Sequence, residues 1–235
     1  MNLLLTVEGI SKRFGSNPVL RNVSFSVLEG EVLGLIGPNG TGKTTLFECL
    51  AGLMHADAGD VRFRNHPVPA PRRKEALFYL PDAIRPWGDQ RLNWALRFFG
   101  KLYGRSKNEV ADVARALSLE ALMVSRIRSL SKGELKRAML AISLLTRHEL
   151  LLLDEPFDGL DLRQTRDVMT LFQKQASGGR TLFLSIHQLV DASRVCHRVV
   201  LLSAGTVVLE GTLEELKAKA GLSEGGLEEV FLALT

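Results

Sequence analysis

The sequence predicts an α/β fold with a mixed, mainly parallel core sheet, an N-terminal antiparallel β subdomain and an inserted helical subdomain. Three short apolar runs, at 32–36, 150–153 and 181–186, have the continuous pattern of strands that are covered on both faces. Residues 3–29 alternate between apolar and polar side chains, which indicates an antiparallel sheet with one face in solvent. Residues 88–146 have a helical period instead.

The individual elements follow in chain order. Val23, Phe25 and Val27 alternate with serines, and residues 60–64 repeat this period of two, so both segments are expected to be strands. Residues 199–211 predict a hairpin of two apolar strands that turns at Ala204-Gly205. The apolar residues expected to share a helical face are Leu92, Leu96, Phe99 and Leu102 in one helix, Leu135, Met139 and Ile142 in another, and Leu227, Val230, Phe231 and Leu234 in the last.

Composition excludes several classes of protein. The 235 residues are 46% hydrophobic and 24% charged, as in an ordinary globular protein, and the net charge of +4 is scattered, so we expect no nucleic-acid partner. Cys49 and Cys196 lie in apolar patterns without disulfide or metal spacing, which predicts reduced core thiols. Because no apolar run approaches 18 residues, we expect a cytoplasmic protein that does not itself span a membrane.

A phosphate-binding loop is predicted between the buried strand at 32–36 and the helix that follows. The segment "GPNGTGKT" has the pattern G-x-x-x-x-G-K-[ST], whose glycines allow backbone N–H groups to surround phosphate oxygens at a helix N-terminus. Lys43 can reach the β and γ phosphates, and the Thr44 hydroxyl can bind Mg²⁺. The predicted ATP-binding residues of this P-loop NTPase fold are Gly37, Pro38, Asn39, Gly40, Thr41, Gly42, Lys43, Thr44 and Thr45.

Two carboxylates close the buried strand at 150–153. Because ligands bind at the carboxyl edge of a parallel sheet, Asp154 and Glu155 are expected to lie close to the phosphate loop. Asp154 is suited to hold Mg²⁺, directly or through water. Glu155 is a candidate to orient or deprotonate the attacking water.

The ordered set of the phosphate loop, "LSKGE", "LLLLDEP", "GLD" and a histidine after the next strand resembles the nucleotide-binding subunit of ATP-binding cassette (ABC) transporters over essentially the whole chain. The resemblance implies ATP and Mg²⁺ as cofactors. It also implies that "LSKGE" is the family's signature sequence, in which Ser131 and Gly133 bind the γ-phosphate held by a second subunit. Residue types favour a simpler role as well, because Ser131 and Glu134 can form a capping box at a helix start. The two roles can coexist.

The resemblance assigns three further residues. Phe14 in "KRFG" matches the aromatic residue that stacks on adenine, although a single Phe after a strand is more often a core residue. His187 in "LSIHQ" matches the switch histidine, which contacts the γ-phosphate and helps to hold water and Glu155. Asp161 in "GLD" matches a loop that crosses to the opposite subunit in the family. Aspartate at the start of a helix is also an ordinary N-cap residue.

The chain departs from the family pattern at several positions. Asp82 stands where the family presents a glutamine to Mg²⁺ and water, and it can still bind the metal through water. A third carboxylate near Asp154 and Glu155 predicts electrostatic repulsion and hence a steep Mg²⁺ dependence. Lys132 replaces a signature glycine, and it can face either the phosphate or solvent. No role is assigned to His197.

The resemblance further implies the partners. One partner is an integral membrane permease that is a separate polypeptide and would hold this subunit on the cytoplasmic face of the membrane. The other is a second nucleotide-binding subunit, which gives a homodimer in the ATP state. The tail "GLEEVFLALT" resembles exporter subunits. The permease is expected to dock on the helical insert and on 82–94, whose interface-type residues are Arg85, Trp87, Arg91 and Trp94.

One ABC ATPase domain is predicted over 1–235. The nucleotide-binding core with its β subdomain is placed at 1–87 and 147–220, the helical subdomain at 88–146 and a C-terminal helix at 221–235. A rival function is a non-transport cassette ATPase that acts on ribosomes or nucleic acid, but such proteins usually join two cassettes or insert a long coiled coil. A phosphate-loop kinase or GTPase would leave "LSKGE" unexplained.

Overall fold

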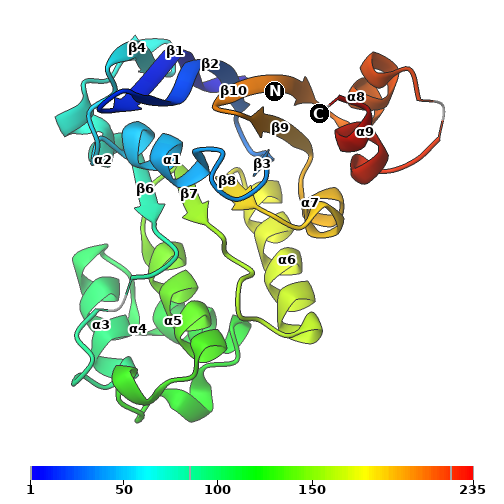
Figure 1. The fold of residues 1–235 in the computed structure, drawn as a ribbon. Helices are drawn as coiled ribbons and strands as arrows, with labels where there is room; N and C mark the ends of the chain where they lie inside the picture. Colours follow the sequence, from blue (N-terminus) through cyan, green and yellow to red (C-terminus); the bar gives the residue numbers. More distant parts are fainter. Residues whose placement is uncertain (1, 85, 223, 235) are drawn as a thin grey trace.

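The computed structural model describes residues 2–84, 86–222 and 224–234. Its first sheet is antiparallel, has the strand order β2-β1-β4-β5, and forms the upper part of the molecule in Figure 1. Its strands are β1 (Leu3–Phe14), β2 (Asn17–Leu28), β4 (Ala58–Phe63) and β5 (His66–Pro67). The alternation seen in the N-terminal sequence thus predicted this antiparallel sheet correctly.

The second sheet is mixed and has the order β10-β9-β3-β8-β7-β6. Five neighbouring strands run parallel, and β10 pairs antiparallel with β9. The strands are β3 (Val32–Ile36), β6 (Leu77–Leu80), β7 (Leu150–Asp154), β8 (Thr181–Ile186), β9 (Arg198–Ser203) and β10 (Thr206–Gly211). The three continuous apolar runs became the central strands β3, β7 and β8, which confirms the predicted fold class.

Helices cover the mixed sheet and extend below it in Figure 1. The helical insert contains α3 (Leu92–Leu102), α4 (Lys107–Ala116) and α5 (Lys132–Leu145), and these pack on one another. The remaining helices are α1 (Lys43–Ala51), α2 (Arg73–Ala76), α6 (Leu162–Ser177), α7 (Leu189–Val195), α8 (Leu213–Ala220) and α9 (Leu227–Leu234), with short 3₁₀ turns at Ala70–Arg72, Glu120–Leu122 and Ile127–Ser129. Of these described helices, none is both long and apolar enough to cross a bilayer.

The central strands contribute to two hydrophobic cores, one on each face of the mixed sheet. Alternate residues of β7 point to opposite sides: Leu150 and Leu152 pack with α1 and the antiparallel sheet, whereas Leu151 and Leu153 pack with α5 and α6. In the upper core, the ring of Phe183 lies 4.9 Å from that of Phe47, measured between centroids. Because both faces are covered, these strands need apolar residues at every position.

Most of the expected buried faces are confirmed, with one correction. Leu92 and Leu96 are fully buried, and Met139 and Ile142 are almost fully buried. Leu102, however, is 62% exposed, so the prediction that it shares their buried face is wrong. It is the last residue of α3, where the helix ends and the chain turns away at Tyr103.

The C-terminal part contains the predicted hairpin and helix. Ala204 and Gly205 both have positive φ angles, 46° and 79°, which suit a two-residue turn between β9 and β10. In α9, Leu227 and Val230 are buried. The side chain of Leu234, which was expected on the same face, lies outside the described residues. The boundaries proposed for the subdomains stay predictions.

Candidate functional site

The phosphate loop joins β3 to α1 with a backbone that requires glycine at defined points. Gly40 and Gly42 have φ angles of 82° and 101°, in the left-handed region that side chains disfavour. A Cβ atom at Gly37 would lie 2.2 Å from the carbonyl oxygen of Leu202. The sequence pattern is therefore explained by local geometry, and the loop ends at the N-terminus of α1, where backbone N–H groups favour an anion.

Lys43, the first residue of α1, is held inside this loop. Its ammonium group donates hydrogen bonds to the carbonyl oxygens of Gly37 at 2.7 Å and Pro38 at 3.2 Å. Burial lowers the pKa of Lys43, while the nearby carboxylates of Glu155 and Asp154 act in the opposite direction. The loop is therefore built around a cation, as a site for phosphate requires.

Asp154, at the end of β7, is buried in a network of hydroxyl groups. The Thr44 hydroxyl donates to Oδ2 at 2.9 Å, the Tyr79 hydroxyl approaches the same oxygen at 3.4 Å, and Ser185 Oγ donates to Oδ1. Burial raises the pKa of Tyr79, which keeps this phenol a neutral donor. Hydroxyl and carboxylate oxygens are the donors that Mg²⁺ prefers, so Thr44 and Asp154 fit a magnesium ion.

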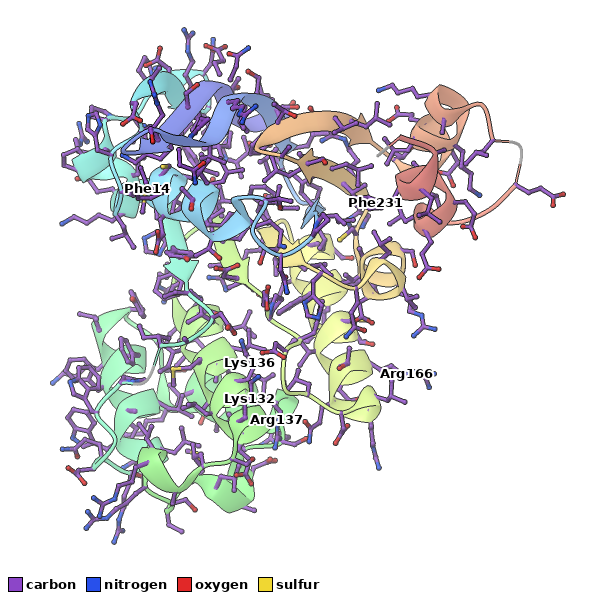
Figure 2. The ribbon with its side chains drawn as sticks, in the orientation of Figure 1. Phe14, Lys132, Lys136, Arg137, Arg166 and Phe231 are labelled. Atoms are coloured by element: carbon purple, nitrogen blue, oxygen red, sulfur yellow. The ribbon has the colours of Figure 1, made fainter. Side chains whose placement is uncertain are left out.

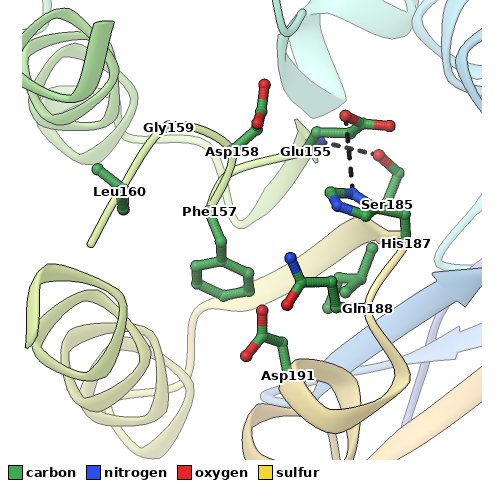
Figure 3. Close-up of a pocket in the computed structure, with 10 residues that line it drawn as sticks. Glu155, Phe157, Asp158, Gly159, Leu160, Ser185, His187, Gln188 and Asp191 are labelled. Atoms are coloured by element: carbon green, nitrogen blue, oxygen red, sulfur yellow. Dashed lines mark hydrogen bonds and ion pairs between the residues drawn. The ribbon is translucent and has the colours of Figure 1, made fainter. Parts of the chain in front are cut away.

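Glu155 has a strained backbone that aims its side chain at His187. Its φ angle is 45°, a conformation that costs a residue with a side chain about 1 to 3 kcal/mol and persists only where the surroundings enforce it. Its N–H donates to Ser185 Oγ at 2.9 Å. His187 Nδ1 lies 3.8 Å from Glu155 Oε2, and Figure 3 shows the imidazole, from the end of β8, facing that carboxylate.

Asp82 follows β6 and lies with Glu155 and Asp158, since one carboxylate oxygen from each falls within 4.8 Å of the others. The expected repulsion is offset by Lys136, whose ammonium lies 2.5 Å from Asp82 Oδ1 and donates to the Glu155 carbonyl at 2.9 Å. Sequence reasoning missed Lys136. Its only signal was its position, one helical turn after Lys132 and close to the apolar residues Leu135 and Met139.

The segment before α5 forms the expected capping box. Glu134 N–H donates to Ser131 Oγ at 3.3 Å, and Ser131 N–H donates to Glu134 Oε2 at 2.8 Å. The hydrogen bond from the Ser131 N–H lowers the pKa of Glu134, which is thus turned back onto its own helix. Among the described residues, no hydrogen bond engages the N–H groups of Lys132 and Gly133.

Gly133 and Lys132 both contact the loop that follows Glu155. A Cβ atom at Gly133 would lie 2.7 Å from the carbonyl oxygen of Gly159, so close packing within the chain already requires glycine there. Lys132 lies 2.6 Å from Asp158, an ion pair that lowers the pKa of that carboxyl group. Lys132 therefore points to solvent, one of the two directions considered from the sequence, with 65% of its side chain exposed and its ammonium paired with Asp158 of its own chain.

The other singled-out residues have these surroundings. Phe14 is 50% exposed, with the Lys12 ammonium 5.5 Å from its ring centroid, so it is not a core residue. Asp161 caps α6 by accepting from the Gln164 N–H at 2.8 Å. His197 Nδ1 accepts from the buried Val32 N–H at 2.9 Å, which is a structural role.

The expected docking segment carries an exposed aromatic cluster. Trp87, Trp94 and Phe98 are each more than 40% exposed, and their rings lie 5.3 to 5.7 Å apart between centroids. Arg85, which was predicted to belong to this surface, lies outside the described residues. Exposed aromatic residues that pack on one another are typical of an interaction surface.

Comparison with known proteins gives consistent matches. Residues 20–158 match the family described as ABC transporter. An uncharacterized ABC transporter ATP-binding protein of Methanocaldococcus jannaschii is 34% identical over 94% of this chain and 82% of its own, and a Nod factor export ATP-binding protein I of Bradyrhizobium diazoefficiens is 32% identical over 92% and 72%. A solved ATP-binding subunit of an ABC transporter has a TM-score of 0.88 at 30% identity, covering 98% of this chain and 99% of its own.

Proposed function

The chain belongs to the ABC transporter family and is an ATP-hydrolysing subunit of a transporter, and we propose that it works as a head-to-tail pair that encloses two ATP molecules and drives a separate membrane subunit. The observation that carries the proposal is the hydrogen bond of 2.9 Å between Thr44 and Asp154. It joins the phosphate loop to the acidic end of β7, so that phosphate and metal ligands converge on one point.

ATP would lie along the loop at 37–45. The N–H groups and Lys43 bind its phosphates, and Phe14, exposed at the end of β1 in the same half of the molecule as α1, stacks on the adenine (Figure 2). Thr44 and Asp154 would hold Mg²⁺, and Asp82 would reach the ion through water. When bound, the ion neutralises charge that develops on the terminal phosphates.

Glu155 and His187 carry the hydrolytic step. The Glu155 carboxylate accepts a proton from the attacking water or orients it, and the imidazole of His187 holds the carboxylate and the γ-phosphate in register. The 3.8 Å separation between His187 Nδ1 and Glu155 Oε2 supports this assignment, because it leaves both groups near one another with room to adjust on nucleotide binding.

The signature segment serves the nucleotide of the second subunit. Figure 2 shows Lys132, the first residue of α5, in the lower half of the molecule and apart from α1, which supports a role for this segment at a nucleotide other than that of its own phosphate loop. The N–H groups of Lys132 and Gly133, which no described residue engages, suit a γ-phosphate supplied in trans, together with the Ser131 hydroxyl and the helix dipole of α5. A homodimer in the ATP state satisfies this requirement.

The membrane partner is a permease that docks on the exposed aromatic cluster of Trp87, Trp94 and Phe98. It would hold the subunit on the cytoplasmic face of the membrane. The Bradyrhizobium relative is named for Nod factor export, which supports export as the direction here. The relatives named above are transporter proteins, so a cassette ATPase acting on ribosomes or nucleic acid is not favoured.

The proposal is tested by nucleotide binding and turnover in two variants. Lys43→Ala should lose ATP binding, because the loop then lacks the cation at its centre. Glu155→Gln should keep ATP binding and lose most turnover. If Lys43→Ala bound Mg-ATP with the affinity of the unaltered protein, the assignment of the site would be wrong.

A further inference from the structure

We propose that Lys136 is a positioning residue for the hydrolysis proposed above, on which this inference rests. Its buried ammonium group ties α5, the helix that begins at the signature segment, to the backbone of Glu155 and to Asp82. One side chain thereby joins three segments of the chain: α5, where Figure 2 labels Lys136, the residue two positions after β6, and the residue directly after β7.

The burial of Lys136 sets it apart from an ordinary helix-surface lysine. Its side chain is only 6% exposed, and a buried ammonium is unfavourable unless charged or polar acceptors compensate it. Asp82 Oδ1 at 2.5 Å supplies the opposite charge, and the Glu155 carbonyl at 2.9 Å supplies a second acceptor. The carboxylate of Asp82 therefore compensates the positive charge of Lys136. A neutral glutamine at position 82 would leave that charge without compensation.

The contact to Glu155 acts on the backbone that directs the catalytic carboxylate. The N–H of Glu155 donates to Ser185 Oγ at 2.9 Å, and its carbonyl accepts from the Lys136 ammonium at 2.9 Å and from the Asp158 N–H at 3.2 Å. These hydrogen bonds fix the peptide groups on both sides of the Glu155 Cα atom. A φ angle of 45° is unfavourable for a residue with a side chain, and such conformations persist where the surroundings enforce them.

Lys132 offers a matched comparison on the same helix. It lies one turn before Lys136 and pairs with Asp158 at 2.6 Å, but its side chain is 65% exposed. Exposed ion pairs contribute little, and Asp158 lies three residues beyond Glu155. Of the two lysines, Lys136 is the one that donates a hydrogen bond to the Glu155 backbone, so a displacement of α5 relative to the sheet should reach Glu155 mainly through Lys136.

The test compares Lys136→Met with Lys132→Met in the full-length protein. The first measurement is hydrogen exchange of the Glu155 amide without nucleotide, followed by NMR. We expect Lys136→Met to speed exchange about tenfold, because the Glu155 carbonyl loses the shorter of the two hydrogen bonds described for it, and Lys132→Met to leave it nearly unchanged. The second measurement is kcat for ATP beside the Kd for ATP, with Lys136→Met lowering kcat about 10- to 100-fold while Kd changes less than about twofold.

Two further variants guard against misfolding. Lys136→Met with Asp82→Asn removes both charges, so it avoids an unpaired carboxylate, and it should show the same rapid Glu155 exchange without nucleotide. Lys136→Arg keeps a donor of similar reach and should restore much of kcat. Melting temperatures of all variants identify any that do not fold.

The inference is overturned if folded Lys136→Met has the Glu155 exchange rate and kcat of the unaltered protein, or if the folded double variant has its Glu155 exchange rate. It is also overturned if ATP affinity falls as much as kcat, because the side chain would then be a general structural support. Failure of the unaltered protein to hydrolyse ATP would count against the proposed function, whereas the exchange rates would still decide whether Lys136 holds Glu155.

Discussion

The Nδ1 atom of His187 lies 3.8 Å from the Oε2 atom of Glu155, although 31 residues of sequence separate the strand ends that carry them. The register of β7 and β8 places Asp154 beside Ser185, so the residues that follow face each other across one edge of the sheet. This relationship makes the pair the first target for mutation.

His187→Ala should lower kcat about 100-fold or more while leaving the Kd for ATP unchanged, since a positioned acid–base partner contributes this much to proton transfer. Single-turnover hydrolysis and equilibrium nucleotide binding separate the two effects. His197→Ala is the control: it leaves the buried Val32 N–H without its acceptor, which costs about 1 to 3 kcal/mol of stability, but it should not lower turnover per folded molecule. Equal kcat losses in both variants would remove His187 from the mechanism.

Ser131→Asp separates the two roles of the signature serine. Aspartate caps a helix about as well as serine, so the melting temperature should stay within a few degrees of that of the unaltered protein. A carboxylate facing a γ-phosphate is repelled, so ATP-dependent dimerisation and turnover should be lost while ATP binding to the monomer is retained. Ser131→Ala should instead lose the cap and reduce the melting temperature. Full activity in the Asp variant would leave Ser131 with a capping role alone.

Thr44→Val should raise the Mg²⁺ concentration needed for half-maximal turnover about tenfold, because it removes a hydroxyl ligand and the hydrogen bond to Asp154. Thr44→Ser keeps the hydroxyl and is the matched control. A magnesium titration of ATP turnover measures both. An identical midpoint in the Val variant would place the ion elsewhere.

Cys49 gives a pH prediction. Burial raises the pKa of its thiol from the ordinary 9.0 to about 11. Its contribution to stability is fully present below pH 9 and is lost as the pH rises towards 11, because the unfolded thiol ionises first. Urea unfolding at pH 8.5 and 10.5 should therefore show a smaller loss of stability in Cys49→Ala than in the unaltered protein. Equal losses would show that the buried thiol does not contribute.

The core strands and the phosphate loop could be predicted from sequence because their backbones dictate residue types. A strand covered on both faces needs the continuous apolar pattern of β3, β7 and β8. A loop with positive φ at Gly40 and Gly42, and with no room for a side chain at Gly37, needs glycine at those points. Such requirements leave a local signal in the sequence.

The burial and contacts of Lys136, and the ion pair of Lys132 with Asp158, could not be predicted. They depend on which distant segments of the chain α5 contacts. A lysine in an amphipathic helix ordinarily faces solvent, and its partner Asp82 is 54 residues away. The exposure of Leu102 likewise depends on where α3 ends. The partner that we propose for the N–H groups of Lys132 and Gly133 is the nucleotide of a second molecule, which one chain cannot display.

The head-to-tail pairing is tested most directly by the structure of the Glu155→Gln variant assembled with Mg-ATP, either with itself or with its partner cassette. We predict that each nucleotide lies between two subunits, with Ser131 Oγ of one at hydrogen-bond distance from the γ-phosphate that Lys43 of the other binds. A nucleotide-loaded structure in which Ser131 is remote from every γ-phosphate would contradict the proposed arrangement.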